Sequence, residues 1–518
     1  MRTRVLRAFL FLGLATLTLE AQVSPPWFSD QTVQDIRLDL NPADWRTLRD
    51  NYLSDAYYPA KLTWEGQTVD RIGIRSRGAG SRSPDKPNLK LDFNHYVKGQ
   101  TFLGLQQAVL KANNQDPSLL REVLAMKLFR QMGLPAPLEA PARLYINGEF
   151  WGAYSLVESV DEAFLRRNFG EDTGYLYSWQ ENRAEGYRFE DLGPDPASYS
   201  PVMWTPENHK SDPDAAPIVA MVQAINLSPD ADFECAVSEF LDLKSVMTYA
   251  AIEDYLATFD SLFGTVFGMN NFYFYRFSGG KLSQFLPWDQ DSAIDWEGRP
   301  LFRGLPENVL GRRALQVPGL RQAYLEAIAK AATVAGGPGG WLEQEANRLY
   351  YLIRDAALQD PHKQCSPAGV LGPCGASDFE ADADHIRQFV RARESFTAAE
   401  AISAGYQPSD AAPRILGAGA AGNGSDQVSP LSPGSLISLS GQLLAAGTAQ
   451  APAKTEPTSL AGVIVTVNGE RAPLLSVSPG QIEARLPLGL APGPAALTVF
   501  VNGVIGNTVT VEISIAPK

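Results

Sequence analysis

Three aspartates follow an apolar hairpin in the stretch 270–296, NNFYFYRFSGGKLSQFLPWDQDSAIDW. These acids are Asp289, Asp291 and Asp295. Their position is unusual, because strands that form a core do not usually end in three carboxylates. Charged side chains mostly lie outside the core, so a solvated strand end explains each acid taken singly. Taken together, the acids also suit a hard cation such as Mg²⁺, which prefers oxygen ligands. This end of the hairpin is therefore a candidate metal site.

The predicted hairpin brings further oxygen atoms to the same place. With Gly279-Gly280 as a two-residue turn, Asn271 falls opposite Trp288 and diagonal to Asp289. The helix predicted from DLKSVMTYAAIEDYLATFD ends near Asp260, shortly before the hairpin begins. We therefore expect Asp260, Asn271 and the first two aspartates of the cluster to converge.

Two classes of enzyme place an acid pair after an apolar strand. Metal-dependent glycosyltransferases hold a nucleotide sugar's diphosphate through Asp-x-Asp, which here would be Asp289 and Asp291. Kinase-like enzymes hold Mg²⁺ with one Asp and one Asn and place a separate Asp beside the acceptor hydroxyl. The order Asp260, Asn271, Asp289 fits the second class, with a longer Asp-to-Asn gap than in ordinary protein kinases.

A kinase-like site also needs a strand lysine for the phosphates and a glutamate that orients it. Lys90 is the candidate lysine, in the middle of NLKLDF, although a strand lysine more often points to water. From spacing alone, Glu149 and Glu158 are equal candidates for its partner.

Other cations and one indole are candidates for contact with a nucleotide. Arg75 and Arg77 alternate on one face of GIRSRG, where they could meet phosphate or form an exposed edge. Arg121 lies in the first turns of a predicted helix, where a cation opposes the helix dipole, so we expect a specific anionic partner. Trp288 could line a nucleotide pocket or simply pack in the core.

Composition limits the partners. The 518 residues have a formal net charge of −14, while residues 412–518 contain five Lys/Arg and five Asp/Glu, so the acidic excess lies upstream. An acidic protein repels phosphate backbones and anionic lipid, which argues against binding of nucleic acid or membrane surfaces. Residues 1–21 have the arginines, short apolar stretch and small terminal residue of a secretory signal peptide. No later segment is apolar enough to span a membrane, so we expect a secreted, periplasmic or cell-surface protein.

Changes in residue composition divide the chain into a predicted signal peptide at 1–21, a larger region at 28–405, a linker at 406–425 and a final domain at 426–518. The larger region interleaves helices and antiparallel hairpins and is predicted to be α+β. The final domain consists of short β-branched runs and predicts an all-β immunoglobulin-like sandwich. We expect this sandwich to carry none of the chemistry, so that a chain ending near Gly405 keeps its nucleotide binding.

The cysteines fit an exported protein. Cys365 and Cys374 flank the turn-rich SPAGVLGP and are predicted to form a disulfide. The third cysteine, Cys235, has no predicted disulfide partner and lies in an apolar segment with helical character. We therefore expect its thiol to be buried.

The larger region resembles the CotH kinase family, the spore-coat protein H group of atypical secreted kinases. The stretches that carry the resemblance occur in the family's order over about 72–292: IRSRGAGSRS, NLKLDF, LKANNQDPSLLREVLAMKLFRQMGLPAP, RLYINGEFWGAYSLVESVDEAFLRRNFG, GYLY, NNFYFYR and FLPWDQD. Two features depart from the family. Gly78-Ala79-Gly80 occurs where the family has a loop rich in Asn and Ser. The family's Lys-Lys pair before the strand is represented here by the separated residues Lys86 and Lys90.

The resemblance implies a divergent protein-kinase-like fold that binds ATP with Mg²⁺ or Mn²⁺ and phosphorylates Ser or Thr of a protein acceptor. It places Asp260 and Asp289 at the essential acidic positions and favours Glu158 as the partner of Lys90. The final domain resembles an immunoglobulin-like module of secreted acidobacterial proteins. We expect a monomer, and the main alternative is a binding or adhesion protein that has the fold without the chemistry.

Overall fold

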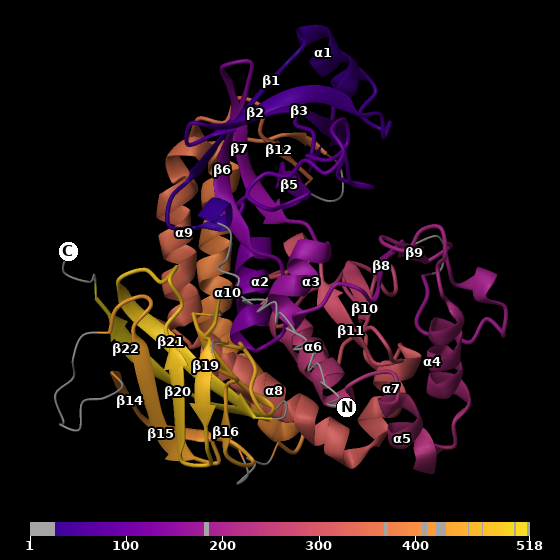
Figure 1. Cartoon of the computed structure of the whole chain (residues 1–518), viewed down its shortest axis with the longest axis vertical. Coiled ribbons are helices and arrows are strands. Elements are labelled where there is room, and N and C mark those ends of the chain that lie inside the picture. Colours follow the sequence, from indigo (N-terminus) through magenta and orange to yellow (C-terminus); the bar gives the residue numbers. More distant parts are fainter. Residues whose placement is uncertain are drawn as a thin grey trace, which may run out of the picture.

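The computed structural model describes residues 26–180, 186–366, 371–406, 412–420, 431–453, 455–468, 470–501 and 504–514 (Figure 1). The predicted signal peptide lies outside these residues. None of the helices within the described ranges has the length and apolarity needed to cross a bilayer.

The N-terminal part is a closed barrel in the order β1-β2-β3-β4-β5-β7-β6, sealed by parallel pairing of β1 with β6. Its strands are β1 (Gln34–Leu40), β2 (Tyr58–Trp64), β3 (Gln67–Ser76), β4 (Leu89–Asp92), β5 (Gln107–Lys111), β6 (Glu139–Ile146) and β7 (Glu149–Glu158). Alternate side chains such as Ile36 and Leu38 fill the interior, as the period of two requires. Asn147 and Gly148, both with positive φ, form the tight β6–β7 turn.

Short helices flank the barrel: η1 (Pro26–Phe28), α1 (Pro42–Asp50), α2 (Arg121–Gln131) and α3 (Glu162–Phe169). Helix α2 lies in the connection between β5 and β6, so it interrupts the succession of barrel strands. Residues in the middle of α2, such as Leu124 and Leu128, pack in the main hydrophobic core.

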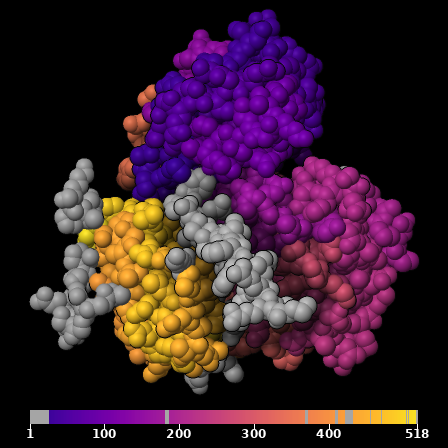
Figure 2. Space-filling model, in the orientation of Figure 1, coloured from indigo at the N-terminus to yellow at the C-terminus, as the bar shows by residue number. Residues whose placement is uncertain are grey.

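The central part combines helices with a sheet in the order β11-β10-β8-β9. The strands are β8 (Tyr175–Trp179), β9 (Trp204–Pro206), β10 (Phe272–Arg276) and β11 (Ser283–Pro287). The helices are η2 (Pro196–Ser198), α4 (Ala216–Leu227), η3 (Asp230–Asp232), α5 (Phe233–Ser238), α6 (Leu243–Tyr255), η4 (Gln290–Ser292), α7 (Val309–Gln316), α8 (Pro318–Ala335), α9 (Trp341–Leu358) and α10 (Ala376–Ser403). Figure 2 shows this part, in magenta and salmon, below and to the right of the indigo barrel.

The predicted hairpin register is confirmed. Phe272 pairs with Pro287, and the Trp288 amide donates to the Asn271 carbonyl at 3.1 Å. The mixed α and β architecture of the larger region is likewise as predicted.

The C-terminal part is a sandwich of two antiparallel sheets, ordered β14-β15-β20-β19-β16 and β18-β17-β21-β22, around a shared aliphatic core. Its strands are β14 (Arg414–Ala420), β15 (Leu436–Gln442), β16 (Ala449–Gln450), β17 (Val463–Val467), β18 (Glu470–Arg471), β19 (Leu474–Val477), β20 (Gln481–Arg485), β21 (Gly493–Val501) and β22 (Val504–Ile513). β14 falls inside the range 406–425 assigned to the linker, because Arg414–Ala420 pairs with β15. The immunoglobulin-like designation stays a prediction.

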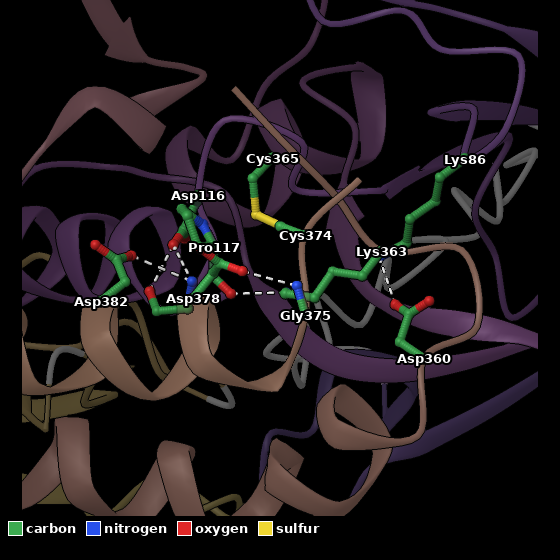
Figure 3. Close-up of a disulfide and its surroundings, with 11 residues drawn as sticks. Lys86, Asp116, Pro117, Asp360, Lys363, Cys365, Cys374, Gly375, Asp378 and Asp382 are labelled. Carbon is green, nitrogen blue, oxygen red and sulfur yellow. Dashed lines mark hydrogen bonds and ion pairs between the residues drawn. A yellow bond between two sulfur atoms is a disulfide. The ribbon is translucent and has the colours of Figure 1, made fainter. Parts of the chain in front are cut away.

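The disulfide between Cys365 and Cys374 is confirmed, and it joins β12 (Gln364–Cys365) to β13 (Gly372–Pro373) just before α10. Figure 3 shows it between the buried Lys86–Asp360 ion pair, 2.7 Å long, and the group around Asp116. Lys86 is thus engaged away from the acid cluster. The prediction for Cys235 is wrong, because this thiol is exposed on the outer face of α5.

Candidate functional site

A lysine and two acids form the centre of the candidate site. The Lys111 ammonium lies 2.5 and 2.6 Å from the two Glu122 carboxylate oxygens and 2.5 Å from Asp289 Oδ1. Lys111 and Glu122 are buried, while the Asp289 side chain is about one-third exposed (35 %). One cation therefore joins strand β5, helix α2 and the segment that follows β11.

The local structure places each member of this group. Lys111 is the last residue of β5, and its partner strand β7 holds it through the Lys111–Ser155 register. Helix α2 starts at Arg121, because the Asp116 carboxylate accepts the Arg121 amide at 2.8 Å, so Glu122 lies in the first turn. Asp289 has φ of 53°, a left-handed conformation uncommon for residues other than glycine, which aims its side chain back towards β5.

The electrostatics of the three groups are coupled. Burial favours neutral Lys111, but Asp289 and Glu122 outweigh it and raise the pKa of Lys111. Burial opposes ionisation of Asp289, but Lys111 and Arg77 hold the pKa of Asp289 below its ordinary value. Burial raises the pKa of Glu122, with Lys111 acting in the opposite direction. Lys111 and Asp289 are consequently both charged at neutral pH and attract each other.

A second part of the site surrounds Asp260. Asn270 Nδ2 donates to Asp260 Oδ1 at 2.8 Å, and Asn271 Nδ2 donates to the Asp260 carbonyl at 3.0 Å. The Ser292 hydroxyl, from the segment after Asp289, also contacts that carbonyl at 3.4 Å. With the Trp288-to-Asn271 hydrogen bond, these contacts link Asp260 continuously to the Lys111 group. Asp260 and Asn271 are therefore in contact, and the convergence of their side-chain oxygens with those of Asp289 stays a prediction.

Asp291 interacts electrostatically with the same group. Burial first, and then the charge of Asp289, raise the pKa of Asp291 well above its ordinary value, while the Lys111 charge opposes them. Within the described parts of the chain, neither the Asp291 carboxylate nor Asn271 Oδ1 accepts a hydrogen bond. No three His, Cys, Asp or Glu side chains of the described residues are grouped as metal ligands. Asp289, Asp291 and Asn271 supply oxygen atoms, the ligand type that Mg²⁺ prefers, and a metal bound by these three residues stays a prediction.

The predicted cations separate into two groups. The Arg77 guanidinium carbon lies 5.0 Å, and the Lys111 ammonium 4.9 Å, from the centre of the Trp288 ring, so Arg77 and Trp288 belong to the site. Trp288 is 8 % exposed and packs edge-on against Tyr273. Arg75 instead binds Asp55 at 2.8 Å, away from the acid cluster.

The prediction of a Lys90–Glu158 pair is wrong. Glu158 binds Arg167 at 2.5 Å and accepts the Leu138 amide. In the strand register Lys90 lies opposite Val109, whereas Glu158 lies opposite the neighbouring Ala108. Successive strand residues point to opposite faces, so the two side chains diverge.

Lys90 still points to the Trp288 side of the sheet, because Val109 packs in one cluster with Trp288. Burial lowers the pKa of Lys90, opposed by the charge of Glu207.

Arg121 has the anionic partner expected for it, which is Asp382. Its Nε lies 3.2 Å from Asp382 Oδ2 in α10, and its Nη1 donates to the carbonyls of Ala293 and Ile294. His385, also in α10, contacts the Ile294 carbonyl at 2.9 Å. The start of α2, helix α10 and the segment after Asp289 are thus tied together.

Two residues of the site, Lys111 and Glu122, are missed by reasoning from the sequence. A signal for them exists: Lys111 ends the apolar run AVL, and Glu122 lies in the first turn of the next helix. A strand lysine followed by a glutamate near a helix start is the pattern that a kinase-like site requires, and it occurs here and not around Lys90.

Asp161 at the start of α3 gives a pH prediction. Its Oδ1 accepts the Ala163 and Phe164 amides, and its Oδ2 is buried without a hydrogen-bond partner among the described residues. Burial raises the pKa of Asp161 from 3.8 to about 7. The unfolded chain therefore loses this proton near pH 4 and the folded chain near pH 7, so stability falls as pH rises between these values.

Asp161→Asn keeps the helix cap and removes this titration. We expect the variant to match the wild type near pH 4 and to be more stable by about 4 kcal/mol at pH 8, since each of about three pKa units contributes about 1.4 kcal/mol, as measured by urea unfolding. Asp195→Asn, at the exposed cap of η2, serves as the control. An equal effect of Asp161→Asn at both pH values would contradict the prediction.

Comparisons with known proteins identify the family of the chain. The family model described as CotH kinase protein matches residues 74–397. This chain belongs to the CotH family. The inner spore coat protein H of Bacillus subtilis (strain 168) is 24 % identical over 370 residues, covering 70 % of this chain and 95 % of the relative. The inner spore coat protein H-like protein of the same organism is 36 % identical over 74 residues, which are 14 % of this chain and 24 % of that protein.

Solved structures also match, among them one of a kinase. The crystal structure of the Helicobacter pylori proinflammatory kinase CtkA aligns at 10 % identity and a TM-score of 0.24, over 73 % of this chain and 100 % of that chain. At that TM-score the two folds are not shown to be the same. The family model covers β5, α2 and the hairpin β10–β11, so Lys111, Glu122, Asp260 and Asp289 all lie within the CotH region.

Proposed function

We propose that this chain is an exported atypical protein kinase that transfers the γ-phosphate of ATP to Ser or Thr of a protein acceptor. The observation that carries the proposal is the Lys111–Glu122–Asp289 group. A kinase-like site needs a strand lysine, a helix glutamate that orients it and an acid for the metal, and all three meet here. Membership of a family described as kinases supports the same activity.

Each residue has a distinct task in this proposal. Glu122 holds the Lys111 ammonium in place, so that Lys111 can bind the phosphates of ATP. Arg77 adds positive charge beside it, and Trp288 provides an apolar surface. Asp260, with its carboxylate oriented by Asn270, accepts the hydrogen bond of the acceptor hydroxyl. Asp289 and Asn271, with Asp291 near them, would hold Mg²⁺ or Mn²⁺, which neutralises phosphate charge when bound.

Positioning and charge neutralisation are then the main sources of catalysis. The glycosyltransferase alternative would use Asp289 and Asp291 alone and gives no role to the Lys111–Glu122 pair. The name of the Bacillus relative, a spore coat protein, supports a surface or coat location, as does the predicted signal peptide.

The test is transfer of labelled γ-phosphate to a Ser-rich protein with Mg²⁺ or Mn²⁺. Wild-type protein is expected to label the acceptor, and Asp260→Ala to lower the rate about 10²- to 10⁴-fold with little change in ATP affinity, since a general base contributes that much. Asp230→Ala, at an exposed acid paired with Arg313, is the matched control. Binding of Mg-ATP by the wild type without any transfer would contradict the proposal and favour the binding-protein alternative.

A further inference from the structure

The outer face of one sheet of the C-terminal sandwich is buried. The core-facing residues of β17 are Val463, Val465 and Val467. By alternation, Ile464 and Thr466 point out of the sandwich, and their partners across the ladder are Phe500 and Thr498. Thr466 and Thr498 are nevertheless 0 % exposed and Phe500 is 4 % exposed. A face that would ordinarily meet water is therefore covered by another part of the chain.

The covering element is the C-terminal end of helix α2, together with α8. Gln131 Nε2 donates to the Ala496 carbonyl at 3.1 Å, and the Thr466 hydroxyl donates to the Gln131 carbonyl at 3.3 Å. Arg471 Nη2 donates to the Gly133 carbonyl at 2.7 Å. Gly133 lies against Phe500 so closely that a Cβ there would be 2.9 Å from the ring. Figure 1 shows the yellow sandwich beside the helical region that contains α2 and α8.

Phe500 is a member of the main hydrophobic core, which also contains Leu124 and Phe129 of α2. The sandwich therefore contributes a side chain to the hydrophobic core around helix α2, and it is packed against the rest of the chain as well as joined to it by the polypeptide. Its three hydrogen bonds satisfy polar groups at the end of α2 and just beyond it, where a helix leaves carbonyls without partners.

Helix α2 also carries Glu122, at its opposite end. That end is held by Asp382 of α10, which binds Arg121 and accepts the Ser118 amide. A helix moves largely as one rigid rod, so its tilt is set by what holds its two ends. The distance between Glu122 and Lys111 thus depends on contacts made by the sandwich at the other end of the helix.

We infer that the C-terminal sandwich is a positioning module that holds α2 so that Glu122 stays on Lys111, with Arg471 and Phe500 as its positioning residues. This inference rests on the proposed kinase function. It replaces the expectation that a chain ending near Gly405 keeps its nucleotide binding, because such a chain would lack every contact between the sandwich and the end of α2.

The test uses the full-length chain with Arg471→Ala and Phe500→Ala, separately and together. Hydrogen exchange of the α2 amides, residues 121–131, is measured beside the apparent KM for ATP and kcat. We expect exchange of α2 to speed up and kcat/KM for ATP to fall by about 3- to 30-fold in the double variant, the usual range for coupling through packed elements. Arg471→Lys, which can still reach the Gly133 carbonyl, should recover part of the loss.

Arg485→Ala is the matched control, because Arg485 lies in the other sheet and binds Glu456 at 2.7 Å. Exchange of α2 that is unchanged in the double variant would overturn the inference, as would faster exchange with unaltered kcat/KM. A wild-type chain that transfers no phosphate would refute the proposed function instead, and the exchange of α2 would still show whether the sandwich restrains the helix.

Discussion

Lys111→Met is expected to lower phosphoryl transfer about a thousandfold, whereas Lys90→Met lowers it less than about tenfold. Removing one preorganised charge from a site of this kind commonly costs two to three orders of magnitude. Lys111 contacts both Glu122 and Asp289, while Lys90 shares the same side of the sheet and contacts neither. The pair of variants therefore separates a lysine that binds phosphate from one that merely lies nearby on the neighbouring strand.

Loss of Lys111 also leaves two acids without their cation. Breaking a buried ion pair costs about 3–5 kcal/mol, so a Lys111→Met chain could be poorly folded. Lys111→Arg retains the charge and is expected to fold, yet to remain at least about a hundredfold impaired, because the larger planar guanidinium does not occupy the position of an ammonium. Circular dichroism and thermal unfolding accompany the transfer assay. Equal losses in Lys90→Met and Lys111→Met would refute the assignment of Lys111.

Asp289→Asn is expected to abolish the Mg²⁺-dependent part of ATP binding and to lower transfer about a thousandfold. The substitution conserves shape and removes only the charge that a divalent cation needs, and stabilisation of charge usually contributes most to catalysis at such sites. The measurement is thermal stabilisation by ATP with and without Mg²⁺, together with the labelled-phosphate assay.

The control for Asp289→Asn is Asp295→Asn. Asp295 belongs to the same acid cluster in sequence, but it is half-exposed and lies 3.7 Å from Arg299. We expect Asp295→Asn to leave both metal-dependent binding and transfer within about twofold of the wild type. If Asp289→Asn kept the response to Mg²⁺, the metal would have to be bound elsewhere and the assignment of the acid cluster would fail.

The local pattern of the chain is sufficient to predict the hairpin and its acids. Gly279-Gly280 sets the turn, and the turn sets the register that places Asn271 opposite Trp288. Register depends on turn length and on the alternation of apolar residues, which are local properties. The disulfide is predictable for a similar reason, because Cys365 and Cys374 are close in sequence and flank a loop.

The lysine of the site is not predictable in this way. Lys90 and Lys111 both occur in short apolar strands, and the glutamate that follows Lys111 in the next helix distinguishes the two lysines only if that helix is known to pack against the end of the strand. Which lysine meets a glutamate depends on where helix α2 packs against the barrel. That packing is a tertiary contact, and no local turn signal in the sequence indicates it. The same holds for Glu158, which binds Arg167 in the structure and not Lys90.

By itself, then, the sequence determined the mixed α and β larger region, the all-β C-terminal part, the cysteine bridge and the acid-rich end of the β10–β11 hairpin. Only the tertiary structure decided that Lys111 and Glu122 complete the group, and that the sandwich is docked on α2. The outward residues Ile464, Thr466 and Phe500 follow the same alternation that a solvated sheet face would follow. Alternation reports which residues share a face, and it does not report whether water or another element covers that face.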